Sequence, residues 1–150
     1  MSYLVNSFDK LMASRYVVVV IILLGFLARL AGAALAPFPG IADSNHYYNL
    51  ARNLAAGRGF VIDYIWQYHN PPVDVTHPIN YWMPLPAVLP ALGLRLAPDS
   101  LFAALIPSVI IGTLILMLTY GTARLLDQRH SVHVLALLCV VFIPQHVMNA

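Results

Sequence analysis

The fold is decided by one long apolar run near the N-terminus, YVVVVIILLGFLARLAGAALA, residues 16–36. A helix of about 20 residues at 1.5 Å per residue crosses the roughly 30 Å hydrocarbon core of a bilayer. The competing interpretation is a cleaved signal peptide, with AGAALA as the small-residue cleavage site. The run is longer than the apolar core of a signal peptide and contains Arg29, and both facts favour a membrane-spanning helix.

The composition of the whole chain agrees with a membrane environment. Of its 150 residues, 60% are hydrophobic and only 9% are charged, whereas a soluble domain has roughly 25% charged residues. A polar surface cannot be built from so few charges, so lipid must be the solvent for most of the chain. We therefore predict an all-α integral membrane protein.

The charges and the single cysteine also exclude some classes of protein. The eight Lys and Arg residues are scattered and give a net charge of only +2, without the basic run that binds nucleic acid. Cys139 is the one cysteine, which excludes an internal disulfide and argues against a cysteine-based metal site.

Three further apolar segments predict a multi-pass protein of the cell membrane. They cover residues 81–97, 100–126 and 132–150. Lys10 and Arg15 place the N-terminus in the cytoplasm by the positive-inside rule, so the polar loop 37–80 emerges on the outer face. The last apolar segment has no polar tail after it, and we therefore expect the chain to be the N-terminal part of a longer protein.

The second apolar segment, 81–97, leaves the topology open. It is short and is interrupted by Pro84, Pro86 and Pro90, so we interpret it as a kinked span. Full crossing would leave the basic loop 124–130 outside the cell, against the positive-inside rule. A re-entrant segment would restore the rule, although full crossing is the interpretation that we favour.

Within the external loop, residues 43–56 have the pattern of a short helix. Asp43 is a suitable N-cap, and Gly57 is a suitable C′ residue. Apolar side chains recur at helical spacing and form one stripe, which consists of Tyr47, Leu50, Ala51, Leu54 and Ala55. The pattern predicts an amphipathic juxtamembrane helix that lies along the membrane surface.

Asp43 is the sharpest candidate for chemistry. A carboxylate at the start of a helix just beyond the first span can act as a general base or bind a divalent metal ion. The alternative is an ordinary N-cap. His46 and Tyr47 follow at helical spacing, so they share one side of the helix with Asp43 and complete a small polar site. Three such residues are weak grounds for a metal site.

Two arginines are candidates for binding substrate. Arg29 is a charge inside a predicted span, where it either extends to the membrane surface or reaches Asp43 or a ligand phosphate. Arg58, between Gly57 and Gly59, is suited to an anionic headgroup or a lipid phosphate. The aromatic residues that follow, including Trp66, either line a sugar-binding groove or form an interfacial belt, as we expect of Tyr81 and Trp82.

The order of these motifs resembles a known superfamily. LARLAG is followed by DSNHYYNLARNLAAGRGF and then by HPINYWMPLPAVLPAL. This is similar to the N-terminus of the GT-C polytopic glycosyltransferases, in particular glycosyltransferase family 39, the branch of protein O-mannosyltransferases and lipid A aminoarabinose transferases. The residues that match the family pattern are Asp43, Tyr47, Leu50, Ala51, Leu54, Gly57 and Gly59.

The resemblance implies a role for Asp43 as the catalytic carboxylate of the first external loop, which deprotonates or orients the acceptor. The donor would be a polyprenyl-phosphate sugar at the membrane, and the acceptor a protein or a lipid. Many family members have two adjacent acidic residues, whereas Ser44 follows Asp43 here. Because family members are several times longer, we do not expect the isolated chain to be active alone. The alternative is a non-catalytic subunit of a membrane-protein complex that keeps this module for assembly or lipid binding.

Overall fold

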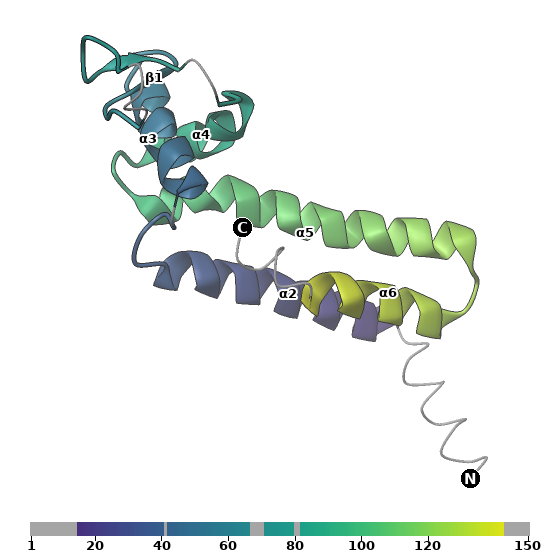
Figure 1. The fold of residues 1–150 in the computed structure, drawn as a ribbon. Coiled ribbons are helices and arrows are strands. Elements are labelled where there is room, and N and C mark those ends of the chain that lie inside the picture. Colours follow the sequence, from purple (N-terminus) through teal and green to yellow (C-terminus); the bar gives the residue numbers. More distant parts are fainter. Residues whose placement is uncertain (1–14, 41, 67–70, 80–81, 143–150) are drawn as a thin grey trace, which may run out of the picture. The chain divides into compact units, whose positions relative to one another are not determined.

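The computed structural model describes residues 15–40, 42–66, 71–79 and 82–142. The helices are α2 (Arg15–Leu35), α3 (Asp43–Ala55), α4 (Val88–Leu96), α5 (Leu101–Leu126) and α6 (His130–Phe142), with the 3-10 turn η1 (Leu85–Ala87) before α4. Strands β1 (Val61–Ile62) and β2 (His77–Pro78) form an antiparallel pair (Figure 1). The chain divides into two compact units, which are described separately: a helical unit with α2, α6 and α5 from Val109, and a loop unit, residues 35–108.

Two helices are long and apolar enough to cross a membrane, Tyr16–Leu35 and Leu101–Leu126. They coincide with the predicted spans 16–36 and 100–126 to within one residue. The described residues are mainly helical, and the two short strands add no sheet core. This architecture is compatible with an all-α membrane protein.

The second predicted span differs from the structure. Residues 81–97 contain only the three residues of η1 and the nine of α4, which give a helix of roughly 18 Å. That is shorter than a hydrocarbon core of about 30 Å, so this helix is not one of the two candidate spans. The full crossing of residues 81–97 stays a prediction. The fourth segment, 132–150, is helical up to Phe142, and its remainder lies outside the described residues.

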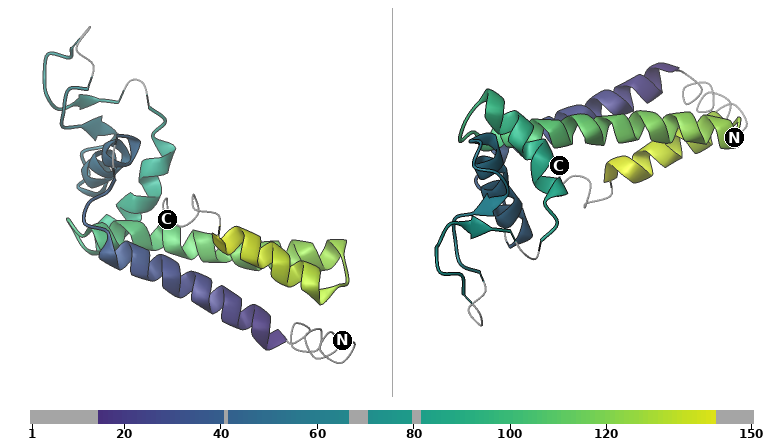
Figure 2. Two further views of the ribbon diagram at one scale, coloured as in Figure 1. Left: turned by 60° about the horizontal axis from the view of Figure 1, so that its bottom comes forward. Right: turned by 90° about the horizontal axis from the view of Figure 1, so that it is seen from above.

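The helical unit is held together by aliphatic packing. Val18 of α2 is buried with Leu116 of α5 and with Val134 and Leu137 of α6. Figure 2 shows α6 running beside the second half of α5. The buried residues therefore tie together three segments that are far apart in the sequence.

The apolar stripe of α3 is buried within the loop unit. Leu50 and Ala51 are fully covered and pack in one cluster with Ala87, Ala91 and other apolar residues of η1, α4 and α5. The stripe predicted from the sequence is therefore a real apolar face, but η1 and α4 cover it. The predicted position of this helix along the membrane surface stays a prediction, and its apolar face packs against protein.

The predicted capping residues of α3 differ from the structure at the N-terminal end and agree with it at the C-terminal end. The N-cap residue is Ala42, and no side chain caps the helix, so the predicted capping role of Asp43 is wrong. At the other end Gly57 has a φ of +77°, and the amides of Gly57 and Arg58 donate to the carbonyls of Leu54 and Asn53. These two bonds form a Schellman motif, which confirms Gly57 as the C′ residue.

The contact between α4 and the start of α5 is very close. Gly93 is buried on α4, and a Cβ placed there would lie 1.8 Å from the carbonyl oxygen of Ala103. Only a residue without a side chain fits at this crossing.

Candidate functional site

A cleft lies at the N-terminal end of α3. Its volume is about 260 Å³, and it is lined by Ala42, Asp43, Asn45, His46, Tyr64, Trp66 and Trp82. The lining comes from the start of α3, the segment after β1 and the segment before η1, so the fold of the loop unit brings these residues together. Asp43 is exposed in the first turn of α3, where the helix dipole stabilises a negative charge.

His46 forms the inner wall of the cleft. Its side chain is buried, and Nδ1 lies 2.6 Å from the hydroxyl of Tyr64. The ring centroid is 5.1 Å from that of Trp82 and meets Tyr47 edge-on. The Nε2 atom has no hydrogen-bond partner among the described residues. Of the predicted group, Asp43 and His46 line the cleft together with tryptophan and tyrosine rings, whereas Tyr47 contacts the His46 ring and is not part of the lining.

Burial controls the charge of this site. It lowers the pKa of His46 below its ordinary value, against the opposing effect of the negative charge of Asp43. Burial also raises the pKa of Tyr64, and the charge of Asp43 acts in the same direction. Both groups are consequently neutral at pH 7, and Asp43 is the charged residue of the cleft lining.

We expect acid to destabilise the cleft through His46. A histidine with a lowered pKa in the folded state contributes stability above its unfolded pKa of about 6.5, and this stability is lost as the pH falls through the lower folded pKa. Both tryptophans of the chain line the cleft, so thermal unfolding detected by tryptophan fluorescence monitors it directly. The thermal unfolding midpoint of the full chain should be lower at pH 5 than at pH 7.

The matched variants for this pH dependence are His46→Gln and His130→Gln. His46→Gln should flatten the dependence, whereas His130→Gln, at an exposed position at the start of α6, should keep it. An unchanged pH dependence in His46→Gln would contradict the assignment.

The backbone at the mouth of the cleft is strained. Ala42 has a φ of +49° and a ψ of −109°, a conformation that is rare for a residue with a side chain and costs about 1–3 kcal/mol. Asn45 donates a hydrogen bond from Nδ2 to the carbonyl of Gly40, which ties this turn to the first turn of α3. The strained turn fixes where Asp43 begins the helix.

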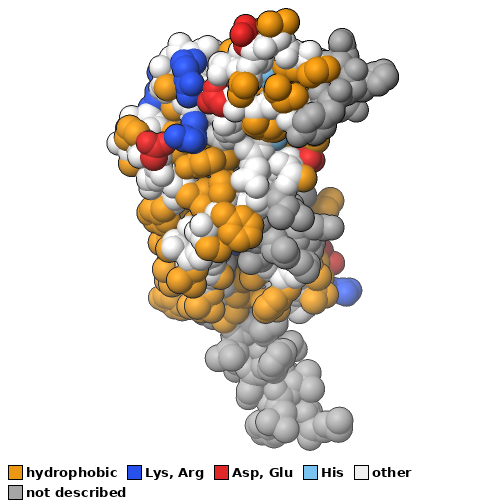
Figure 3. Space-filling view, turned by 60° about the vertical axis from the view of Figure 1, so that its left-hand side comes forward, with side chains coloured by type: hydrophobic (Ala, Val, Ile, Leu, Met, Phe, Trp, Pro, Cys, Tyr) orange, Lys and Arg blue, Asp and Glu red, His pale blue; other side chains and the backbone are white. Residues whose placement is uncertain are grey.

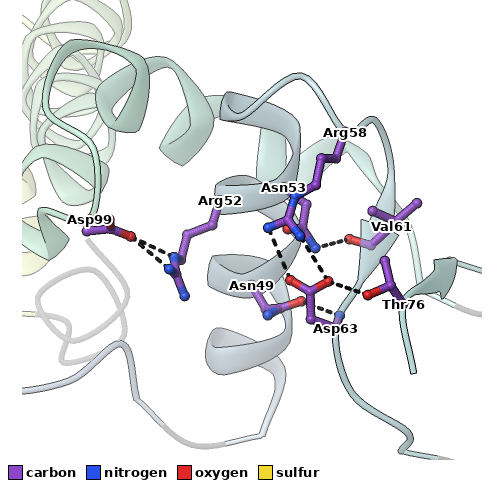
Figure 4. A network of polar contacts seen from close by, with 8 residues as sticks. All are labelled: Asn49, Arg52, Asn53, Arg58, Val61, Asp63, Thr76 and Asp99. Atoms are coloured by element: carbon purple, nitrogen blue, oxygen red, sulfur yellow. Dashed lines mark hydrogen bonds and ion pairs between the residues drawn. The ribbon is translucent and has the colours of Figure 1, made fainter. Parts of the chain in front are cut away.

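Arg58 is engaged in a polar network outside the cleft lining (Figure 4). Its Nη2 lies 3.2 Å from Oδ2 of Asp63. The Asp63 carboxylate also accepts a hydrogen bond from the Thr76 hydroxyl, and the backbone N–H of Asp63 donates to Oδ1 of Asn49. Burial alone would raise the pKa of Asp63, but its hydrogen bonds and nearby arginines lower it overall. The structure thus gives Arg58 a carboxylate partner and does not group it with Asp43.

Arg29 is enclosed in the helical unit. Its side chain is 2% exposed, and Nη1 donates to the carbonyl of Gly25 at 3.0 Å. A Cβ at position 112 would lie 2.9 Å from its Nε atom, so the guanidinium occupies the space that Gly112 leaves. Arg29 is therefore covered by protein and does not extend to the surface of its unit.

The described residues contain no group of three His, Cys, Asp or Glu side chains arranged to hold a metal ion. Asp43 and His46 are thus two potential ligands without a third beside them in this part of the chain.

Some of the residues that line the cleft were predicted from the sequence as candidate site residues, and others were not. Trp66 and the tyrosines of the loop, Tyr64 among them, were candidates for a sugar-binding groove. Trp82 was assigned to an interfacial belt, and neither Tyr64 nor Trp82 was grouped with Asp43. Both lie in irregular segments, where no periodicity shows which side chains meet. The only signal for them was the concentration of aromatic residues between Tyr64 and Trp82.

Fold and site together define a mainly helical protein with two candidate membrane spans and a cleft that combines one carboxylate with aromatic rings. Comparison of the chain with protein families, with curated proteins and with solved structures finds no match. The cleft itself is therefore the basis for an assignment of function.

Proposed function

We propose that the chain is the N-terminal part of a membrane glycosyltransferase, which transfers a sugar from a polyprenyl-phosphate donor to a protein or lipid acceptor. The observation that carries the proposal is the cleft, in which Asp43 stands beside Tyr64, Trp66 and Trp82. Aromatic side chains present large apolar faces with a polar edge, which suits the faces of a pyranose ring. The motif order that resembles the GT-C superfamily supports the same function.

In this mechanism Asp43 is the general base. Its carboxylate accepts the proton of the acceptor hydroxyl as the oxygen bonds to the anomeric carbon of the sugar, and the bond from that carbon to the donor phosphate breaks. The bonding electron pair stays on the phosphate oxygen, and polyprenyl phosphate is the leaving group. An unprotonated His46 beside Asp43 adds no positive charge to the cleft, so the carboxylate remains free to take the proton.

The lengths of the helices support an outward-facing cleft. If α2 and α5 each cross the membrane and the helix 85–96 does not, the loop unit lies on one side of the bilayer. The basic loop 124–130 then returns to the side of the N-terminus. This arrangement removes the conflict with the positive-inside rule, and it corresponds to the re-entrant alternative for residues 81–97.

The test is a transfer assay with vesicles that contain a protein carrying this chain. A polyprenyl-phosphate sugar labelled in the sugar is supplied as donor, and a nucleotide sugar is supplied in a parallel reaction. We expect label to reach the acceptor from the lipid-linked donor. Transfer from the nucleotide sugar alone would contradict the donor class, and no transfer from either donor would favour the non-catalytic assembly module.

Binding can be measured separately from transfer. Because both tryptophans line the cleft, donor binding should change the tryptophan fluorescence of the protein. Trp82→Ala removes one aromatic face, and a stacked sugar ring should then bind about tenfold more weakly. An unchanged donor affinity in Trp82→Ala would contradict the proposed position of the sugar.

A further inference from the structure

The outer face of the helix 85–96 carries an apolar stripe that the core does not use. Leu85, Leu89, Leu92 and Leu96 follow helical spacing and are exposed by 75%, 37%, 54% and 89%. The opposite face, with Ala87, Ala91 and Leu94, packs against α3. These four residues, the leucine stripe, thus lie along one side of the helix and remain partly to largely exposed.

A positively charged pocket adjoins the end of the same helix. The arginine pocket has a volume of about 360 Å³, and its charged lining consists of Arg52, Arg58, Arg95 and Asp99. Asp99 pairs with Arg52 at 2.8 Å, and Arg58 pairs with Asp63, which lies outside the lining. Arg95 has no ion-pair partner among the described residues. Figure 3 shows several basic side chains near one another, with acidic and hydrophobic side chains next to them. The pocket lining therefore carries an excess of positive charge.

We propose that the leucine stripe and the arginine pocket together bind the bilayer surface, with the pocket taking the phosphate headgroups of anionic phospholipids. An interfacial helix buries its apolar face at the boundary between headgroups and acyl chains and places basic residues among the headgroups. Arginine suits phosphate because its planar guanidinium offers paired donors. The proposal is independent of whether Asp43 catalyses sugar transfer.

The chain itself identifies a bilayer as the occupant of this surface. Four residues, 97–100, separate α4 from α5, and they span at most about 14 Å when extended. Leu101 begins one of the two helices that are able to cross a membrane. If α5 crosses, α4 is held close to the bilayer surface, where apolar side chains beside guanidinium groups match acyl chains beside phosphates.

Asp99 competes with a bound phosphate. It has a φ of +61°, and its carboxylate contacts Arg52 although both side chains are largely exposed. An exposed ion pair of this kind is worth at most about 1 kcal/mol, so a phosphate can displace it. Removal of the Asp99 carboxylate should therefore strengthen lipid binding, whereas removal of the arginines should weaken it.

Lipid selectivity is the first test. The full chain is equilibrated in detergent micelles that contain both phosphatidylcholine and phosphatidylglycerol. The lipids that stay bound are counted by native mass spectrometry. We expect preferential retention of phosphatidylglycerol. Arg52→Gln and Arg95→Gln should each lower that preference about fivefold, and Asp99→Asn should raise it severalfold.

The matched control is Arg124→Gln, at an exposed position in α5. It should leave the lipid preference nearly unchanged, and an equal loss in this variant would overturn the proposal. Retention of added polyprenyl phosphate without retention of phosphatidylglycerol would assign the pocket to a sugar donor and would also overturn it.

Depth in the bilayer is the second test. A spin label is attached at Leu92→Cys in a Cys139→Ser background, and the protein is placed in nanodiscs. We expect the label to be accessible to oxygen and shielded from a water-soluble nickel complex. Access to nickel would overturn the proposal, as would shielding that appears only when two copies share a nanodisc, because a second copy would then cover the stripe.

Discussion

Replacing Asp43 with asparagine is expected to lower the rate of sugar transfer by about 10²–10⁴-fold, the usual contribution of a general base. Asparagine keeps the size of the side chain and removes its ability to take a proton. The side chain of Asp43 makes no capping hydrogen bond, so the variant should unfold at nearly the same temperature as the wild type. The measurement is the initial rate of transfer from a polyprenyl-phosphate sugar, with the unfolding midpoint taken alongside.

The control for Asp43→Asn is Asp74→Asn, an exposed aspartate of the same loop unit. It should transfer sugar at the wild-type rate. Equal rates in Asp43→Asn and the wild type would remove Asp43 from the mechanism. A loss of rate accompanied by a large drop in the unfolding temperature would instead indicate a structural role and would count against catalysis.

Gly93→Ala is expected to have the largest effect on stability. The new Cβ would lie 1.8 Å from the carbonyl oxygen of Ala103 and 2.6 Å from its carbon. Both are backbone atoms, so no flexible side chain can move aside, and α4 must separate from α5. Overpacking of a core usually costs about 1–3 kcal/mol, and we expect a loss above roughly 3 kcal/mol here.

Thermal unfolding detected by tryptophan fluorescence measures this loss, and Gly121→Ala is the control. Gly121 lies inside α5 with nothing within 4 Å of an added Cβ. Alanine is a better helix former than glycine by about 1 kcal/mol, so this variant should be unchanged or slightly more stable. A Gly93→Ala variant as stable as the control would show that the close crossing of α4 and α5 does not exist in the protein.

The elements that could be predicted from the sequence are those with a local pattern of residues. A continuous apolar run determines α2 and α5, and a helical stripe that ends at a glycine determines α3. The residues that cover the apolar stripe of α3 could not be predicted, because a stripe that faces lipid and a stripe that packs against α4 have the same sequence pattern. Within the second apolar segment the helix covers residues 85–96, and hydropathy alone does not show where in an apolar segment a helix begins.

The candidate site shows the same division between local and distant signals. Asp43, His46 and Tyr47 lie within one turn of α3, so helical spacing was enough to group them. Trp82 joins them through the fold of an irregular segment, and Arg52 meets Asp99 across 47 residues of sequence. Contacts of this kind depend on how the loop unit folds as a whole, and a single sequence has no periodic signal for them.

The fit between Arg29 and Gly112 has a consequence for how this protein varies in evolution. The guanidinium fills the space beside a residue without a side chain, so the two positions are constrained as a pair. Among related sequences, glycine at position 112 should accompany arginine at position 29. A smaller, uncharged residue at position 29 should permit alanine or serine at position 112.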